Sequence, residues 1–218
     1  MAFSIHSIYR RLFKIWRRKR FLLFVKYINP SAGDRLLDVG GYPEVWVAQD
    51  VVKRVVTLNV HAVAWDPSAP DHGHIAPLVG DGCALAFPDG SFEIGYSNSV
   101  IEHVGSWERQ QRFAAEIRRT GRALWVQTPA YECPIEPHYL APFIHYLPRP
   151  VQKKVVRWFT LRGWIERPTP AEIDEMVEST RLLRRSEFAQ LFPDCTILTE
   201  RLLGFIPKSY IAFRQKGP

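Results

Sequence analysis

The sequence predicts an α/β fold, in which helices cover a doubly wound, mostly parallel β-sheet. Five short apolar runs indicate the parallel strands, because strands buried on both faces are apolar throughout rather than alternating. These runs span residues 35–39, 54–60, 74–79, 92–97 and 122–128. Two later runs, 196–205 and 209–215, lie on either side of Pro207. They predict an antiparallel hairpin that completes a seven-stranded sheet.

The helices of this fold are predicted from apolar residues at helical spacing. The clearest segment spans about residues 106–120, with Trp107, Phe113 and Ile117 as its apolar positions. Further helical segments are expected near 170–180 and 186–192. Strands that alternate with helices along one chain are typical of a parallel sheet with helices on its faces.

The chain is long enough for one full-sized core, because it has 218 residues, of which 46% are hydrophobic. We divide it into a helical segment, residues 1–33, and one domain, residues 34–218. An insertion at about 129–170 interrupts the domain. Prolines exclude a long helix or a strand from its first part, whereas residues 150–160 are helical. Insertions of this length usually form functional covers or loops.

The net positive charge is concentrated in the first 33 residues. This segment contains eight arginines and lysines and no acid, whereas residues 34–218 sum to a net charge of −1. Domains that bind nucleic acid present basic surface across their folded body. The charge distribution therefore disfavours nucleic acid as a partner.

Residues 4–27 predict an amphipathic helix in which Ile5, Ile8 and Leu12 recur at helical spacing. In one interpretation the helix packs on the domain and its basic face is solvated. In the other, the basic face makes peripheral contact with an anionic membrane. Both can hold together. The apolar run 21–25 is too short to span a bilayer.

The three cysteines are far apart and include no C-x-x-C pair. The sequence therefore indicates neither a disulfide framework nor a zinc ribbon. A reducing compartment follows as the expectation, so we predict a cytoplasmic protein that the first helix can make membrane-peripheral.

Polar residues and glycines stand where four of the predicted parallel strands end. They are Asp38, Gly40 and Gly41 after the first strand, Asn59 after the second, Asp81 after the third, and Ser97 and Asn98 after the fourth. The carboxyl ends of parallel strands meet at one edge of a sheet, and open α/β sheets bind their ligands there. A glycine pair also lets the backbone approach a ligand closely, but it lacks the G-x-G-x-x-G pattern of a dinucleotide site.

Residues 34–128 resemble the class I S-adenosylmethionine-dependent methyltransferases, in particular the branch that acts on small molecules. In that branch the run is G-D-A-x-x-L-P-F-x-D-x-S-F-D, followed by Glu-His. Here it reads Gly80-Asp81-Gly82, Leu85, Phe87, Asp89, Ser91-Phe92-Glu93 and Glu102-His103. The resemblance implies a Rossmann-like sheet that ends in an antiparallel pair, and S-adenosylmethionine as the cofactor.

The resemblance also implies which residues bind the cofactor. The expected contacts are Asp38, Gly40 and Gly41 with the methionine part, Asn59 with the ribose, Asp81 and Gly82 with the adenine, and Ser97 and Asn98 with the sulfonium and amino-acid end.

The chain departs from the family pattern in two places. Tyr42 and Glu44 stand where the first motif usually has further glycines, and Asn59 stands where the family has an acid at the ribose. An amide can still hydrogen-bond to hydroxyls, but it loses the contribution of the charge.

Methyl transfer requires alignment of the two partners and exclusion of water, and it requires a base only when the acceptor carries a proton to lose. His103 is a candidate because it follows the fourth strand. His138 is the preferred candidate, since the neighbouring Glu136 could orient it. His145 is more typical of a structural residue, and structural roles stay open for His103 and His138. No metal site is predicted, because the donors at 132–138 match no recognised pattern.

The acceptor is expected under the insertion, where Arg149, Lys153, Lys154, Arg157 and Arg162 predict a second basic patch. We therefore predict a methyltransferase for a small or amphiphilic, anionic acceptor, including a lipid-linked one. The main alternative is a methyltransferase-like protein that binds a ligand or partner without catalysis. An RNA-binding methyltransferase is disfavoured by the near-neutral charge of residues 34–218, and the sequence does not indicate the oligomeric state.

Overall fold

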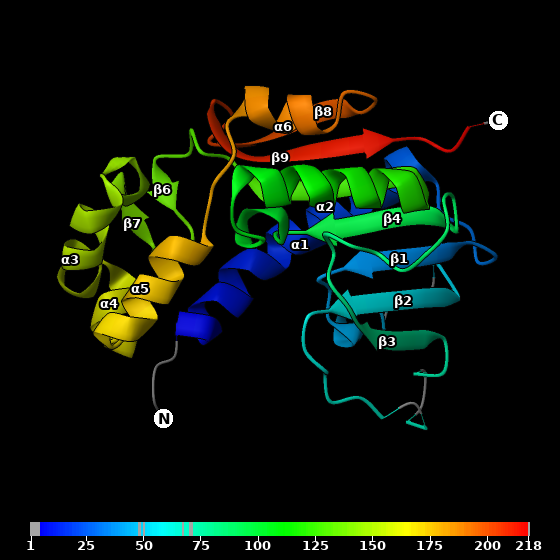
Figure 1. The fold of residues 1–218 in the computed structure, drawn as a ribbon, viewed down its shortest axis with the longest axis horizontal. Helices are drawn as coiled ribbons and strands as arrows, with labels where there is room; N and C mark the ends of the chain where they lie inside the picture. The colour runs from blue at the N-terminus through cyan, green and yellow to red at the C-terminus, as the bar shows by residue number, and fades with distance from the viewer. Residues whose placement is uncertain (1–4, 48, 50, 67, 70–71, 218) are drawn as a thin grey trace.

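The computed structural model describes residues 5–47, 49, 51–66, 68–69 and 72–217, with side chains from residue 16 onward. Residue 4, the first of the predicted helix, lies outside this range. Seven strands form one sheet in the order β3-β2-β1-β4-β5-β9-β8 (Figure 1). The strands are β1 (Arg35–Val39), β2 (Arg54–Asn59), β3 (Ile75–Val79), β4 (Phe92–Asn98), β5 (Gly121–Pro129), β8 (Thr196–Leu202) and β9 (Ile206–Arg214).

The pairing confirms the predicted topology. Strands β1 to β5 pair with one another in parallel, whereas β9 is antiparallel to both of its neighbours, β5 and β8. The order reverses between β1 and β4, where open sheets of this kind bind their ligands. The register places Val39 beside Leu58, and Asn98 beside Gln127. The ends of β1, β2, β4 and β5 therefore lie along one edge.

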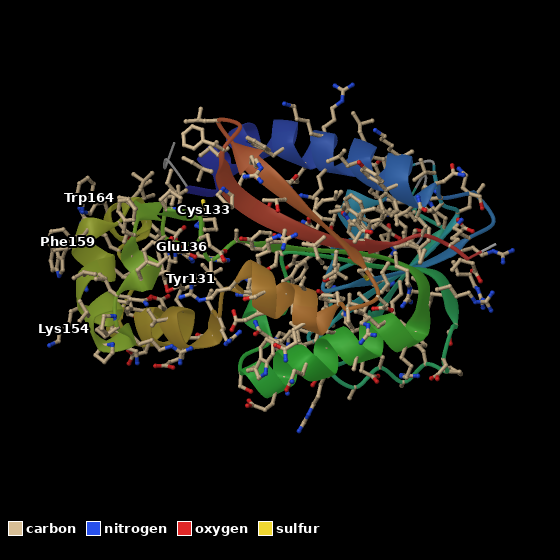
Figure 2. The ribbon with its side chains drawn as sticks, turned by 90° about the horizontal axis from the view of Figure 1, so that it is seen from above. Tyr131, Cys133, Glu136, Lys154, Phe159 and Trp164 are labelled. Carbon is tan, nitrogen blue, oxygen red and sulfur yellow. The ribbon has the colours of Figure 1, made fainter. Side chains whose placement is uncertain are left out.

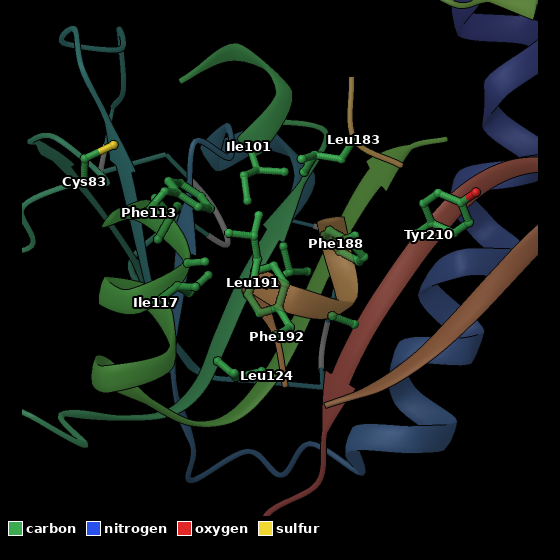
Figure 3. Packing of buried hydrophobic residues seen from close by; sticks show 14 of the residues in the cluster. Cys83, Ile101, Phe113, Ile117, Leu124, Leu183, Phe188, Leu191, Phe192 and Tyr210 are labelled. Atoms are coloured by element: carbon green, nitrogen blue, oxygen red, sulfur yellow. The ribbon is translucent and has the colours of Figure 1, made fainter. Parts of the chain in front are cut away.

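Two layers of helices cover the sheet. Helix α1 (Ile5–Ile28) packs on one face, where Phe24 lies against Tyr96 and Trp125. Helices α2 (Trp107–Thr120) and α6 (Arg185–Leu191) cover the other face, where Phe113 and Phe188 belong to the larger core cluster (Figure 3). Apolar burial on both faces explains why the parallel strands are apolar throughout.

Short connections rather than α-helices join the first four strands in the described part of the chain. Among the described residues of 40–91, only a 3₁₀-helix, Pro43–Val45, connects the strands. Trp46, just after that turn, is buried and packs against Phe24 and Tyr96. An aromatic side chain from a short loop thus supplies apolar cover on this face, together with α1.

The insertion forms a small unit beyond the carboxyl ends of the parallel strands (Figure 1). Its elements are β6 (Ile135–Glu136), β7 (Ala141–Pro142), α3 (Arg149–Phe159), α4 (Leu161–Glu166) and α5 (Pro170–Ser179). Tyr139, Val156 and Val177 belong to a core cluster of its own. The predicted helix at 150–160 is confirmed as α3, whereas the exclusion of strands from the first part was wrong, because two-residue strands β6 and β7 pair there between the prolines.

Candidate functional site

The turn after β1 requires glycine at two successive positions. Gly40 has φ +82°, and a Cβ there would lie 2.5 Å from a methyl group of Val100. A Cβ at Gly41 would overlap the carboxylate of Asp38. The chain therefore passes close over the end of β1 and leaves its backbone accessible to a ligand.

Asp38 is a buried carboxylate that forms no ion pair within the described part of the chain. The Trp46 Nε1 group donates a 2.7 Å hydrogen bond to Oδ2, whereas Oδ1 has no partner among the described residues. Burial raises the pKa of Asp38 to about 7, although the hydrogen bond from Trp46 acts in the opposite direction. A ligand that carries positive charge would compensate this buried acid.

Asn59 joins the end of β2 to the glycine turn. Its Nδ2 group donates a 2.8 Å hydrogen bond to the carbonyl oxygen of Gly41. This contact orients the amide and directs Oδ1 to its other side. Because Oδ1 is an acceptor, it can take a hydrogen bond from a ligand hydroxyl.

Asp81 lies at the same edge and is held by two donors. The backbone N–H of Cys83 donates to Oδ1 at 2.9 Å, and Arg109 Nη2 lies 3.1 Å from Oδ2. The Cys83 contact first, and then Arg109, lower the pKa of Asp81. A Cβ at Gly82 would come within 2.7 Å of Val39 and 2.9 Å of Phe113, so a larger residue does not fit there.

Ser97 and Asn98 use their side chains within the protein. Buried Ser97 donates to the carbonyl oxygen of Val39 at 2.9 Å and so ties β4 to β1. The Asn98 Oδ1 atom accepts a 2.7 Å hydrogen bond from Arg20. Their role in cofactor binding stays a prediction, which for Ser97 rests on position rather than on a free polar atom.

Arg20 of α1 reaches this edge, although the sequence placed the basic residues of the helix on a solvated face. It is only 8% exposed and donates to Gln127 at 2.9 Å as well as to Asn98. It also forms a 2.7 Å ion pair with Glu200 on β8. Arg17, Arg18 and Lys19 are exposed, as expected. No local signal separates Arg20 from them, because its partners lie far away in the sequence.

The two preferred histidines of the sequence meet in the structure. The Nε2 atoms of His103 and His138 are 3.0 Å apart, with the rings perpendicular. Glu136 Oε1 lies 2.5 Å from His138 Nδ1, and Glu136 Oε2 accepts from the backbone N–H of Tyr139 at 2.7 Å. Glu136 is therefore fixed by the backbone and in turn fixes the ring of His138.

The two rings differ in exposure and in charge preference. His103 is exposed, whereas the side chain of His138 is 19% exposed. Burial alone would lower the pKa of His138, but the Glu136 carboxylate and, more weakly, Glu102 raise it above its ordinary value. The pKa of His103 is lowered, mainly because the surrounding protein removes water from part of the ring, and second because of the charge on His138. A proton shared by the pair therefore resides on His138.

Glu102 is a further member of this cluster. It is fully buried and accepts a 3.0 Å hydrogen bond from Thr128 through Oε2, while Oε1 has no partner among the described residues. Burial raises the pKa of Glu102 to about 7, against the effect of His138. The sequence contained a signal in the Glu102-His103 pair, but it assigned no role to the glutamate.

Donor atoms of Glu102, His103 and His138 lie within 4.8 Å of one another, a spacing that a metal ion could also bridge. Of the donors at 132–138 that the sequence considered, His138 belongs to this group, whereas Glu132 accepts a 2.5 Å hydrogen bond from Tyr210. The hydrogen bond that His138 Nδ1 donates to Glu136 and the one between the two rings account for the positions of the imidazoles.

A polar cavity of about 320 Å³ lies between the insertion and the segment before α6. Its lining includes Glu136, Tyr131, His145, Arg181 and Arg184. In Figure 2, Tyr131 and Glu136 lie where the insertion meets the sheet domain. Arg184 stacks over the Tyr131 ring at 4.2 Å, and His145 Nε2 donates to the carbonyl oxygen of Tyr131 at 2.9 Å. The cavity thus combines aromatic surface with guanidinium groups, and Glu136, the hydrogen-bond partner of His138, is part of its wall.

Comparison with known proteins supports this description. Residues 37–123 match the family model described as a methyltransferase domain. No curated protein sequence matches the chain significantly.

Three solved structures illustrate the similarity of fold. The 1,6-didemethyltoxoflavin-N1-methyltransferase of Burkholderia thailandensis, solved with S-adenosylhomocysteine, has a TM-score of 0.58 at 12% identity, over 97% of this chain and 85% of that one. A SAM-dependent methyltransferase from Methanosarcina mazei has a TM-score of 0.52 at 14% identity, over 89% and 96%. A putative zinc-dependent alcohol dehydrogenase from Rhodobacter sphaeroides has a TM-score of 0.57 at 11% identity, over 92% and 90%. At these identities the likeness concerns the fold.

The family match and the strand order together confirm the class that the sequence indicated. Residues 37–123 carry the match to the methyltransferase domain, and the fold is similar to that of class I S-adenosylmethionine-dependent methyltransferases, whose cofactor is S-adenosylmethionine. The residues present fit that cofactor, because Asp38 offers an unpartnered buried oxygen near the glycine turn.

Proposed function

We propose that the protein transfers a methyl group from S-adenosylmethionine to a small or amphiphilic, anionic acceptor. The observation that carries the proposal is the His103–His138–Glu136 chain beside the edge where β1 and β4 end. This chain would place a proton acceptor beside the cofactor edge. A methyl acceptor such as a hydroxyl or an amine must lose a proton during the reaction.

The cofactor would be held by the residues that end the strands. Asp38 would face the cationic amino-acid end of the cofactor, and Asn59 would accept a hydrogen bond from a ribose hydroxyl. The glycine turn would let the cofactor approach the protein backbone closely. When bound, S-adenosylmethionine supplies a methyl carbon activated by positive sulfur. The protein then has to align the acceptor with that carbon and exclude water.

The geometry supports a two-histidine route for the acceptor proton. Glu136 accepts from Nδ1 of His138, so neutral His138 accepts at Nε2 from the Nε2–H group of His103. Nδ1 of exposed His103 is then the nitrogen available to the acceptor. As the proton arrives there, the Nε2 proton of His103 passes to His138, and Glu136 stabilises the imidazolium.

The proposal revises the order of the two histidines. The sequence favoured His138 as the residue that handles the acceptor directly, whereas its exposure favours His103 for that contact. His138 becomes the final proton carrier, and Glu136 becomes its positioning residue.

The acceptor class rests on the cavity behind these residues. The Arg184 side chain is exposed, lies over Tyr131, and forms no ion pair with a carboxylate in the described part of the chain. Arg181 is hydrogen-bonded to Gln110 and paired with Glu187 at the cavity wall. Guanidinium and aromatic groups in one cavity suit an anionic group attached to an apolar or ring-containing body.

The protein would reach a lipid-linked acceptor through peripheral contact with an anionic membrane. Exposed Arg17, Arg18 and Lys19 on α1 support this partner. No helix in the described residues is long and apolar enough to cross a membrane.

A second candidate function is ligand binding without catalysis. Two observations favour it: Asn59 replaces the usual acid, and Arg109 already pairs with Asp81 at the adenine position. Calorimetric titration with S-adenosylmethionine and S-adenosylhomocysteine, followed by transfer of a tritiated methyl group to water-soluble and chloroform-soluble cell extracts, distinguishes the two. Saturable binding with labelled product supports the enzyme. Binding without product from either extract supports the alternative.

A further inference from the structure

The far corner of the insertion exposes three large aromatic side chains. Trp158 is 64% exposed, Phe159 is 74% exposed and Trp164 is 66% exposed. Figure 2 shows Phe159 and Trp164 at the outer margin of the insertion, away from the sheet. The insertion has its own core around Val156, so these aromatics are exposed although apolar neighbours are available. Aromatic patches of this kind mark interaction sites.

The backbone holds this corner in one shape. Thr160 is buried between α3 and α4, donates to the carbonyl oxygen of Val156 at 2.6 Å and accepts from the N–H of Gly163 at 2.8 Å. A Cβ at Gly163 would overlap carbonyl oxygens of α3. The Nε1 group of Trp164 donates to the carbonyl oxygen of Trp158 at 2.5 Å. The outward direction of the aromatics is therefore built into the turn.

The five residues of the predicted basic patch fall into two groups. Those on the sides toward α5 or within α4 are neutralised: Lys153 pairs with Asp174 and Glu178, Arg149 pairs with Glu178, and Arg162 pairs with Glu166. The expectation of one shared basic patch was therefore wrong.

Lys154 and Arg157 form the second group, next to the aromatics. Lys154 is exposed, and the Arg157 guanidinium lies 5.5 Å from the centre of the Trp158 ring. No carboxylate in the described ranges forms an ion pair with either residue. Figure 2 places Lys154 on the same outer margin as Phe159 and Trp164. Unneutralised positive charge thus lies beside exposed tryptophan and phenylalanine.

From this arrangement we propose that the α3–α4 corner docks on an anionic lipid membrane. Tryptophan and phenylalanine insert at the boundary between headgroups and acyl chains, and lysine and arginine bind anionic headgroups. The surface is a projecting corner, which suits a deformable lipid layer better than a complementary protein surface. Helix α3 contributes Gln152 to the acceptor cavity and Trp158 to the corner, about 9 Å apart along its axis.

This inference deepens the proposed acceptor class, but its test needs neither cofactor nor acceptor. The full chain is co-sedimented with phosphatidylcholine vesicles and with vesicles that also contain phosphatidylglycerol. We expect stronger binding to the anionic vesicles and weakening by salt. Lys154→Gln with Arg157→Gln should lower partition onto them by about tenfold or more.

One control is matched to this charge variant, and a second is matched to a variant that lacks the three exposed aromatics, Trp158, Phe159 and Trp164. Arg54→Gln with Arg112→Gln removes the same charge from exposed sites elsewhere, and Leu78→Ser with Val79→Ser removes exposed apolar side chains from β3. Both should bind as the wild type does. Trp158→Ser, Phe159→Ser and Trp164→Ser together should weaken binding to both kinds of vesicle, and the binding to anionic vesicles that is left should come from Arg17, Arg18 and Lys19 of α1.

Three results would overturn the proposal. They are an absence of preference for anionic vesicles, wild-type binding by the corner variants, and a wild-type oligomer that the triple aromatic variant converts to a monomer without a change in vesicle binding. The last result would assign the corner to contacts between copies of the chain. Failure of methyl transfer with intact vesicle binding would contradict the proposed activity alone.

Discussion

The Nε2 atoms of His103 and His138 lie 3.0 Å apart, although 35 residues separate them in the chain. His103 belongs to the 3₁₀-turn after β4, and His138 follows the short strand β6 of the insertion. The contact therefore connects the sheet edge with the insertion. It places the two residues that the sequence selected independently in one hydrogen-bonded chain.

Removal of either ring should slow methyl transfer strongly and leave the cofactor bound. We expect His103→Ala and His138→Ala each to lower the turnover rate by about 10²–10⁴-fold, the usual contribution of general base catalysis. His72→Ala, in the β2–β3 connection, is the matched control. Turnover and S-adenosylhomocysteine affinity should be measured together. Equal loss of both in the variants would indicate a structural role.

The Glu136 carboxylate should set the pH range of activity. Glu136, together with Glu102, raises the pKa of His138 against the effects of burial and Arg162, and protonated His138 cannot receive a proton from His103. Activity should therefore rise as the pH increases through the pKa of His138. In Glu136→Gln this pKa falls, so the acidic limb of the kcat/KM profile should move to lower pH. An unchanged acidic limb would contradict the relay.

Asp38 should make the stability of the cofactor-free protein depend on pH. Its folded pKa, about 7, lies above the ordinary value of 3.8, so the folded state binds the proton more tightly than the unfolded state. The associated stability is present below pH 4 and is lost as the pH rises through 7.

Asp38→Asn should reduce this pH dependence and weaken cofactor binding by about tenfold, because it removes the charge opposite the cofactor. Urea unfolding at pH 5 and pH 8, with and without S-adenosylmethionine, measures both effects. Because Glu102 also has a pKa of about 7, the Asp38→Asn variant should keep the part of the pH-dependent stability that Glu102 causes. A wild-type pH profile in Asp38→Asn would show that the buried carboxylate is not the cause.

The glycine turn should tolerate no side chain at Gly41. Its Cβ would overlap Asp38, so Gly41→Ala should lower the free energy of unfolding by about 1–3 kcal/mol and weaken cofactor binding. Gly73→Ala is the control, because no atom lies within 4 Å of its added Cβ and its φ is not positive. Equal free energies of unfolding for the two variants would contradict the close approach of Asp38 to Gly41.

Arg20 should stabilise the fold through Glu200 and the strand ends. Its loss leaves a buried carboxylate without its cation, so Arg20→Ala should lower the free energy of unfolding by about 3 kcal/mol or more. Arg18→Ala removes an exposed arginine from the same helix and should change it by less than about 0.5 kcal/mol. Similar unfolding of both variants would place Arg20 outside the stabilising network.

Much of the fold follows from sequence patterns because burial on both faces leaves continuous apolar runs in β1, β2 and β4. The end of β1 at Val39 and the start of α2 near Trp107 are confirmed within a residue. The cover that Trp46 and α1 together provide before β4 could not be predicted, since the two segments come into contact only in three dimensions.

The site was predictable where chemistry is local and unpredictable where it depends on packing. The strand-end pattern identifies Asn59 and Gly41, which are hydrogen-bonded to each other, and the Glu136–His138 spacing likewise identifies a hydrogen-bonded pair. No local pattern distinguishes Arg109 or Arg20 from the other arginines, because their partners, Asp81 and Glu200, are distant in the sequence. The cofactor and catalytic roles of all these residues stay predictions.

The central claim is that the glycine turn and its neighbours bind S-adenosylmethionine, and calorimetric titration of the full chain with S-adenosylhomocysteine tests it most directly. We predict saturable heat with one site for the wild type, retained in Gly73→Ala and lost in Gly41→Val. An absence of saturable heat in the wild type at millimolar cofactor would contradict the claim. So would a Gly41→Val variant that binds as the wild type does.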